Sequence, residues 1–153
     1  MSEKCNDTEF RKTLESLDPL KQREFAVTFV KHVLPLSDDK RLERVIKIAS
    51  DAEASEEELA AALKTAHAVT FDSHARCGAE GHWSDQAGYF VARAAVAATT
   101  PLAHSRMGGP AWQAAMSARM AFTTSLIDAE SSTQSAHAEC EWQHQTLSDY
   151  LNA

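Results

Sequence analysis

The stretch Val91–Ala98 reads VARAAVAA and contains five alanines in eight residues. Alanine has the highest intrinsic helix propensity, and neither glycine nor proline interrupts this stretch. An alanine-rich helix face also lets neighbouring helices approach closely, since little side chain holds them apart. The stretch therefore predicts a buried helix within a closely packed array of helices.

The composition of the whole chain agrees with a helical array. The chain has 153 residues, of which 44% are hydrophobic and 24% charged, and it contains only five glycines and four prolines. β-branched residues occur singly or in pairs, without the alternation typical of strands. We predict an all-α fold over residues 1–153, a compact single-domain array of six to seven mostly antiparallel helices. A short N-terminal helix is expected within residues 1–18.

Several residues indicate where helices begin and end. Asp18 and Pro19 read as an N-cap followed by a first-turn proline, and Pro35 ends the helix that follows. Ser55 and Glu58 have the spacing of a capping box. The alanine-rich helix is expected to continue through Ala103. After the Gly pair of MGGP, a sixth helix begins at Pro110 and is expected to carry Trp112, Met116, Met120 and Ile127.

The net charge indicates which kind of partner the protein binds, and the cysteine content indicates its cellular compartment. The formal net charge is −7 and the pI is near 5.4, without a basic stripe, which argues against a direct nucleic-acid partner and favours a basic protein. No secretory signal or membrane-spanning stretch is visible. The three cysteines, Cys5, Cys77 and Cys140, are widely spaced and odd in number, so we expect reduced thiols in a cytoplasmic protein.

The last helix contains HAECEWQHQ, residues 137–145. At 100° per residue it places two histidines and a cysteine on one stripe and Trp142 on the opposite side. An earlier His-x-x-Cys pair would complete a tetrahedral zinc site if the two helices were adjacent. We favour the alternative that these are core-edge residues, and we predict no metal and no other cofactor. The zinc candidates are His74, Cys77, His137, Cys140 and His144.

Seven acidic residues cluster at the two connections that flank the helix around residues 41–49. We expect the two connections to lie near each other and to contact a basic patch of a protein partner. Helix-start electrostatics and a solvated face are the alternative for each acid taken singly. No phosphate-binding loop or nucleophile elbow is present, so we predict no catalytic residues. The partner-binding candidates are Asp38, Asp39, Asp51, Glu53, Glu56, Glu57 and Glu58.

The segment FAVTFVKHVLPLSDDKRLERVIKIA, residues 25–49, resembles the N-terminal signature of a family of small, all-helical immunity proteins of bacterial polymorphic-toxin systems. AALKTAHAV, residues 61–69, is similar to the family's alanine-rich helix with a central histidine, and ECEWQHQTLSDYL, residues 139–151, is similar to its closing helix. The resemblance extends over about residues 25–151 and departs from the family in RMGGPAWQ and SHARCGAEGHWSD. The positions that match its motifs are His32, Pro35, Arg41, His67, Glu139, Trp142 and Gln143.

The resemblance implies a protein that binds and neutralises a cognate toxin C-terminal domain inside the producing cell. Covering the toxin's active site or its substrate site is sufficient, so no chemistry is required of the binder. Two alternatives stay open at this point. One is a helical metal-dependent enzyme that uses some of His67, His74, His137 and His144, and the other is an immunity protein that enzymatically reverses toxin damage.

Overall fold

The computed structural model describes residues 7–80, 83–125 and 135–152, with side chains at all of these positions except 76–80, 83–85 and 135–137. The described residues form seven α-helices and two short 3-10 helices, with no strand among them, which confirms the all-α prediction. The elements are α1 (Asp7–Ser16), α2 (Pro19–Val33), η1 (Leu34–Leu36), α3 (Arg41–Ala49), α4 (Glu56–Glu80), α5 (Trp83–Thr99), η2 (Leu102–His104), α6 (Gly109–Ser125) and α7 (Ser135–Leu151).

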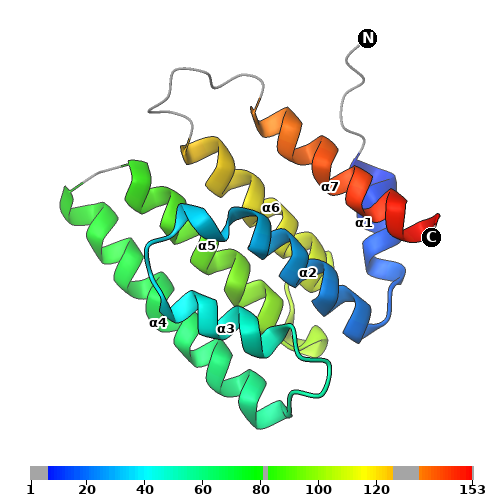
Figure 1. Cartoon of the computed structure of the whole chain (residues 1–153), viewed down its shortest axis with the longest axis horizontal. Coiled ribbons are helices and arrows are strands. Elements are labelled where there is room, and N and C mark those ends of the chain that lie inside the picture. Colours follow the sequence, from blue (N-terminus) through cyan, green and yellow to red (C-terminus); the bar gives the residue numbers. More distant parts are fainter. Residues whose placement is uncertain (1–6, 81–82, 126–134, 153) are drawn as a thin grey trace.

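The helices are arranged in a layered stack (Figure 1). α4, α5 and α6 lie side by side and alternate in direction, as short connections between helices favour. α2 packs against α5 and α6, whereas α3 packs against α4 and α5, so these two helices cover one side of the layer. α1 and α7 both pack against α6. α4 and α7 consequently lie at opposite edges of the stack.

Alanines line the contact between α5 and α6, the most extensive helix–helix contact among the described residues. Both helices turn fully buried alanines toward the interior, including Ala92, Ala95 and Ala98 of α5 and Ala111, Ala115 and Ala118 of α6. The large residues expected to line α6 lie farther out. Trp112 and Met116 are only partly buried against the core, Met120 is 48% exposed, and Ile127 lies outside the described residues.

Aromatic residues fill the part of the core where alanine leaves space. Phe10 of α1 and Phe29 of α2 are buried, and their ring centroids lie 6.2 Å apart. Phe25 lies 6.1 Å from Phe29 in the same helix. The tilted arrangements of these rings are ones that aromatic pairs favour. Small side chains therefore fill the core between α5 and α6, whereas large aromatic side chains fill it next to α1 and α2.

The predicted helix starts are confirmed by their hydrogen bonds. The Asp18 carboxylate accepts from the backbone N–H of Lys21 at 2.9 Å, ahead of Pro19 in the first turn of α2. At α4, the Glu58 N–H donates to Ser55 Oγ at 3.0 Å, and the Ser55 N–H donates to Glu58 Oε1 at 3.2 Å. These two reciprocal bonds are the capping box that the spacing predicted.

The expected end of the alanine-rich helix is wrong. α5 ends at Thr99 and does not continue through Ala103, because Pro101 lacks the N–H that would extend the helix, and a 3-10 turn follows. Gly108 and Gly109 then have φ of +92° and +84°, a backbone region that disfavours side chains. This pair gives the break before α6. Among the described helices, none has the length and apolar character required to cross a bilayer.

Candidate functional site

The predicted acidic cluster divides into two parts in space. Asp38 and Asp39 precede α3, whereas Asp51 and the acidic residues after it follow α3. A nine-residue helix separates its two ends by roughly 13 Å, and Figure 1 shows the connections at opposite ends. The expectation that the two connections lie near each other is therefore incorrect. The three glutamates Glu56, Glu57 and Glu58 begin α4, next to Asp51 and Glu53.

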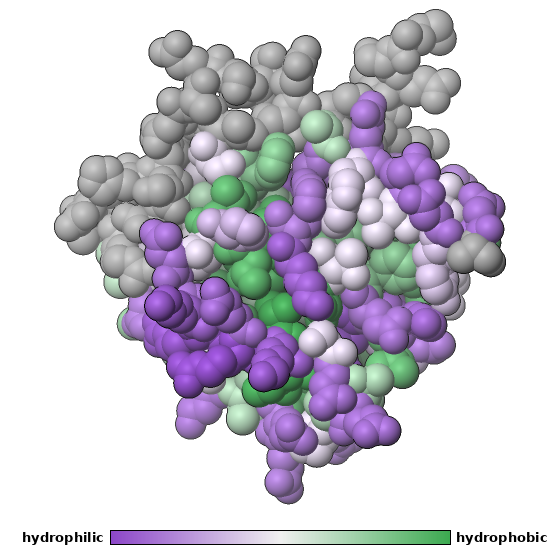
Figure 2. All heavy atoms as spheres, viewed as in Figure 1, coloured by the Kyte–Doolittle hydropathy of each residue, from purple (hydrophilic) through white to green (hydrophobic). Residues whose placement is uncertain are grey.

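We use the name acidic turn for Asp51, Glu53, Glu56 and Glu57, whose side chains are exposed and form no ion pair with a described cation. Its backbone is held from α2, where Arg23 donates to the carbonyl oxygens of Ala49 and Asp51 at 3.1 and 2.9 Å. The Asp51 carboxylate also accepts from the Glu53 N–H at 2.9 Å. The lower edge of the view in Figure 2 is correspondingly hydrophilic.

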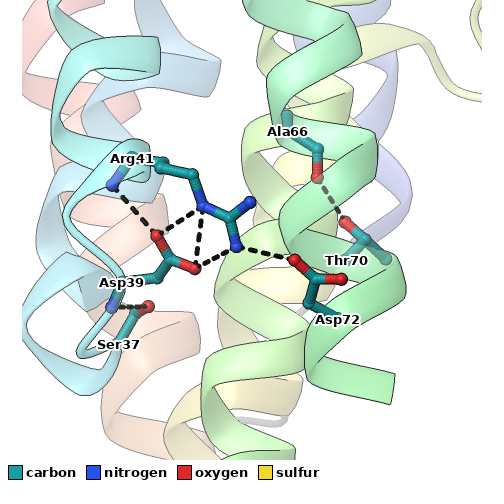
Figure 3. Close-up of polar contacts among 6 residues, drawn as sticks. All are labelled: Ser37, Asp39, Arg41, Ala66, Thr70 and Asp72. Carbon is teal, nitrogen blue, oxygen red and sulfur yellow. Dashed lines mark hydrogen bonds and ion pairs between the residues drawn. The ribbon is translucent and has the colours of Figure 1, made fainter. Parts of the chain in front are cut away.

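Asp39, in the connection before α3, forms hydrogen bonds within the folded chain (Figure 3). Its carboxylate accepts from the Arg41 backbone N–H at 3.0 Å and from the Arg41 guanidinium at 2.7 Å. The same guanidinium donates to Asp72 of α4 at 2.9 Å, so that Arg41 joins α3 to α4. The hydrogen bonds that Arg41 donates to Asp39 and then to Asp72 raise the pKa of Arg41 above its usual range. Arg41, a family-motif position, therefore has a structural role.

The closing helix is attached to α2 through three motif residues. The rings of His32 and Trp142 stack with centroids 3.6 Å apart. His32 Nδ1 lies 2.8 Å from Glu139 Oε2 and 3.2 Å from Oε1, and only the contact to Oε1 has hydrogen-bond geometry. The Glu139 side chain is fully buried, and this burial raises the pKa of the carboxyl group against the opposing effect of His32.

A second set of contacts joins α7 to α6 and α1. Gln143 donates to the Ala115 carbonyl at 3.0 Å and accepts from Arg119 Nε at 2.8 Å. Arg119 makes a bidentate pair with Asp7, both bonds at 2.9 Å, and His144 Nε2 lies 3.1 Å from the same carboxylate. Burial alone would raise the pKa of Asp7, but the hydrogen bonds from Arg119 and His144 lower it overall.

We call this connected set the α7 junction. Each of its carboxylates faces an arginine or a histidine within it, and the set ties α7 to α1, α2 and α6. These contacts cover α7 on more than one side. The buried face of α7 is wider than the expected stripe of histidines and cysteine, because Glu139 and Gln143 are buried beside Cys140. The members of the junction are Asp7, His32, Arg119, Glu139, Trp142, Gln143 and His144.

Among the zinc candidates with described side chains, His74 lies apart from Cys140 and His144. His74 is an exposed residue of α4 that packs against Tyr89, at the edge of the stack opposite α7. Cys77 and His137 have side chains outside the described part. Cys140 and His144 share a 4.8 Å cluster with Asp7, but Arg119 already supplies positive charge to that carboxylate.

Cys140 is disulfide-bonded, so its sulfur is not a thiolate ligand. This corrects the expectation of reduced thiols. The side chains of Cys5 and Cys77 are not among those described, so no pairing is assigned. The Asp7–Cys140–His144 cluster is explained by the ion pair at its centre, and none of its groups is assigned to a metal.

A cleft of about 680 Å³ opens between α4, α5, η2 and α6. Its lining contains four groups that are cationic or can become so, and the described residues around it include no aspartate or glutamate. The guanidinium groups of Arg93 and Arg106 make no hydrogen bond or ion pair with described residues. Arg93 lies 5.8 Å over the Tyr89 ring, which also lines the cleft. The four groups are His67, Arg93, His104 and Arg106.

His67, the motif histidine of α4, is thus exposed at the cleft, whereas Pro35 lies exposed in η1. The sequence did not single out Arg93, His104 or Arg106. One available signal was that Arg93 is the only charged residue in VARAAVAA. The other two residues lie in the connection after Pro101, and their convergence on α4 depends on the packing of α4, α5 and α6.

These features define an all-α protein with an exposed acidic turn, a paired polar junction and an unpaired cationic cleft. A comparison of the chain with protein-family models, curated proteins and solved structures found no match.

Proposed function

We propose that this protein is an immunity protein that binds a cognate bacterial toxin domain inside the producing cell and blocks its active site or substrate site. The observation that carries the proposal is the acidic turn, a group of exposed carboxylates on a backbone that is fixed from two sides. The net charge of −7 adds to the same field. A basic toxin cleft, such as one that handles nucleic acid or nucleotides, would be complementary to this surface.

The fixed backbone of the acidic turn favours binding. Arg23 binds the backbone at the start of the turn, at Ala49 and Asp51, and the Ser55–Glu58 capping box fixes the backbone where the turn enters α4. Binding to a loop that is already ordered costs less conformational entropy than binding that must first order the loop. The carboxylates of Glu56 and Glu57 also lie at the positive end of the α4 dipole, which stabilises their charge.

The contacts made by the residues that carry the family resemblance support the same proposal. Arg41, Glu139, Trp142 and Gln143 make contacts between helices, so these shared residues maintain a scaffold. A scaffold of this kind leaves recognition of individual toxins to the surface. Tight complexes typically bury roughly 1,600 Å² in total, with few dominant anchors.

The proposal is tested first by asking whether the neighbouring reading frame encodes a toxin C-terminal domain, and then by using that domain as the partner. Co-expression should protect cells, and the purified proteins should form a stoichiometric complex. Glu56→Lys should slow association about tenfold at low salt, because it reverses one charge of the steering field. Glu9→Lys is the matched control, since Glu9 is also an acidic residue in the first turn of a helix. Absence of both complex and protection would refute the proposal.

The stoichiometry of protection separates blocking from enzymatic reversal of toxin damage. A blocking protein protects only when its amount matches or exceeds that of the toxin. Full protection by a small fraction of one equivalent would show turnover instead. Titration of a fixed amount of toxin in a cell-free assay gives the answer directly.

A further inference from the structure

We infer that the cleft between α4, α5, η2 and α6 binds a small organic phosphate, with the phosphoryl group held by Arg93 and Arg106. We use the name cationic cleft for this cavity, whose volume is about 680 Å³. Pockets for small ligands fall in the range of roughly 300–1,000 Å³. This ligand is separate from the proposed toxin partner, and the cationic cleft is a different surface from the acidic turn.

The charges of the cleft indicate an anion. Two guanidinium groups and two imidazoles line one concavity in a protein whose net charge is −7. Arg11, Arg41 and Arg119 are paired with carboxylates, whereas Arg93 and Arg106 are not. Arg44 also has no carboxylate partner among the described residues, but it is exposed and lies outside the cleft. Cations gathered in a concave site repel one another, and a bound anion removes that repulsion. The described lining provides no carboxylate that would do so.

A phosphate monoester suits these donors better than a single carboxylate does. It carries close to two negative charges near neutral pH and offers three oxygens, and planar guanidinium groups bind such oxygens in a bidentate manner. Additional donors are available in the same cleft. The Tyr89 and Ser117 hydroxyl groups line it and are not used in hydrogen bonds among the described residues.

The remaining wall indicates that the phosphate belongs to an organic molecule. Leu63 of α4, Val96 of α5 and Pro101 present apolar surface, and the Tyr89 ring adds an aromatic face. Apolar walls with a few polar groups that fix orientation are typical of sites for small molecules. A long nucleic acid is disfavoured, because the acidic turn and the net charge would repel a polyanion.

The inference is tested by isothermal titration calorimetry of the full chain in a buffer without phosphate. Adenosine 5′-monophosphate, adenosine and inorganic phosphate are each titrated separately. Adenosine 5′-monophosphate should bind saturably at one site, adenosine should bind at least tenfold more weakly, and inorganic phosphate should compete. Arg93→Gln and Arg106→Gln should each weaken binding of the monophosphate at least tenfold. Arg44→Gln is the control, since Arg44 is an exposed arginine outside the cleft.

Three outcomes would overturn the inference. They are no saturable binding of the monophosphate, equal binding of adenosine, or unchanged binding by the Arg93→Gln/Arg106→Gln double variant. Thermal unfolding of each variant shows whether it is folded, so a loss of binding is not confused with a loss of structure. Toxin protection by Arg93→Gln should be unchanged, which keeps this test independent of the proposed immunity function.

Discussion

The α7 junction and the cationic cleft both contain arginine and histidine, but they use these residues differently. In the junction, Arg119 is only 14% exposed and is bound by Asp7 and Gln143. In the cleft, Arg93 and Arg106 face an open concavity without a carboxylate partner. A buried cation without a partner is strongly destabilising, whereas an exposed one costs little. The junction therefore contributes to folding, and the cleft is available to bind a ligand.

The junction should show the largest effect on stability at Trp142. Trp142→Ala removes the stacking on His32 and the edge contact with Phe29, and it leaves a space beside the core. We expect a loss of about 3 kcal/mol, the size typical of truncating a large aromatic residue. Chemical denaturation measures it, with Phe71→Ala as the control, since Phe71 is an aromatic residue that is 75% exposed. An unchanged midpoint would show that the ring does not anchor α7.

Arg119→Gln should have the next largest effect. The substitution leaves Asp7 without its bidentate partner and removes a donor from Gln143. Breaking a well-buried pair costs roughly 3–5 kcal/mol, and the partial exposure of Asp7 reduces the expected loss to about 2 kcal/mol. Arg44→Gln is the exposed control and should change stability by less than about 0.5 kcal/mol. Equal losses in both variants would contradict the role assigned to the junction.

The pH dependence of stability should show a smaller effect centred on Asp7. Its pKa is lowered below the usual 3.8 in the folded protein, so its ionised form stabilises folding above that pH. This contribution is lost as the pH falls from 3.8 through the folded-state pKa. Asp7→Asn should cost about 1 kcal/mol at neutral pH, a value that allows for solvent screening. The difference in unfolding free energy between Asp7→Asn and the wild type should shrink in acid. A difference that grows in acid would contradict a lowered pKa of Asp7.

The sequence predicted the helices well because their boundaries depend on local chemistry. The Asp18 cap, the Ser55–Glu58 capping box and the glycine pair before α6 each act within a few residues of chain. α5 ends earlier than its alanine content alone predicts, because Pro101 stops the helix. Local patterns thus located the helices with small errors at their ends.

The sites were less predictable because their partners lie far apart in the sequence. Glu139 and Gln143 would be unfavourable core residues if considered alone, and their burial depends on His32, Ala115 and Arg119 of other helices. The same holds for the cationic cleft, whose lining joins residues from α4 to α6. The alternative zinc set also depends on packing between helices, and its described members are divided between α4 and α7, which lie at opposite edges of the stack.

The comparison of the two regions is tested most directly by thermal unfolding of Arg119→Gln and Arg93→Gln, each with and without adenosine 5′-monophosphate. A stability change of 1 kcal/mol shifts the Tm of a domain of this size by roughly 2–4 °C. We predict that Arg119→Gln lowers the Tm and keeps the rise caused by the ligand. Arg93→Gln should keep the Tm of the free protein and lose that rise. The opposite pattern, or the same response from both variants, would contradict the division between a paired scaffold and an unpaired binding site.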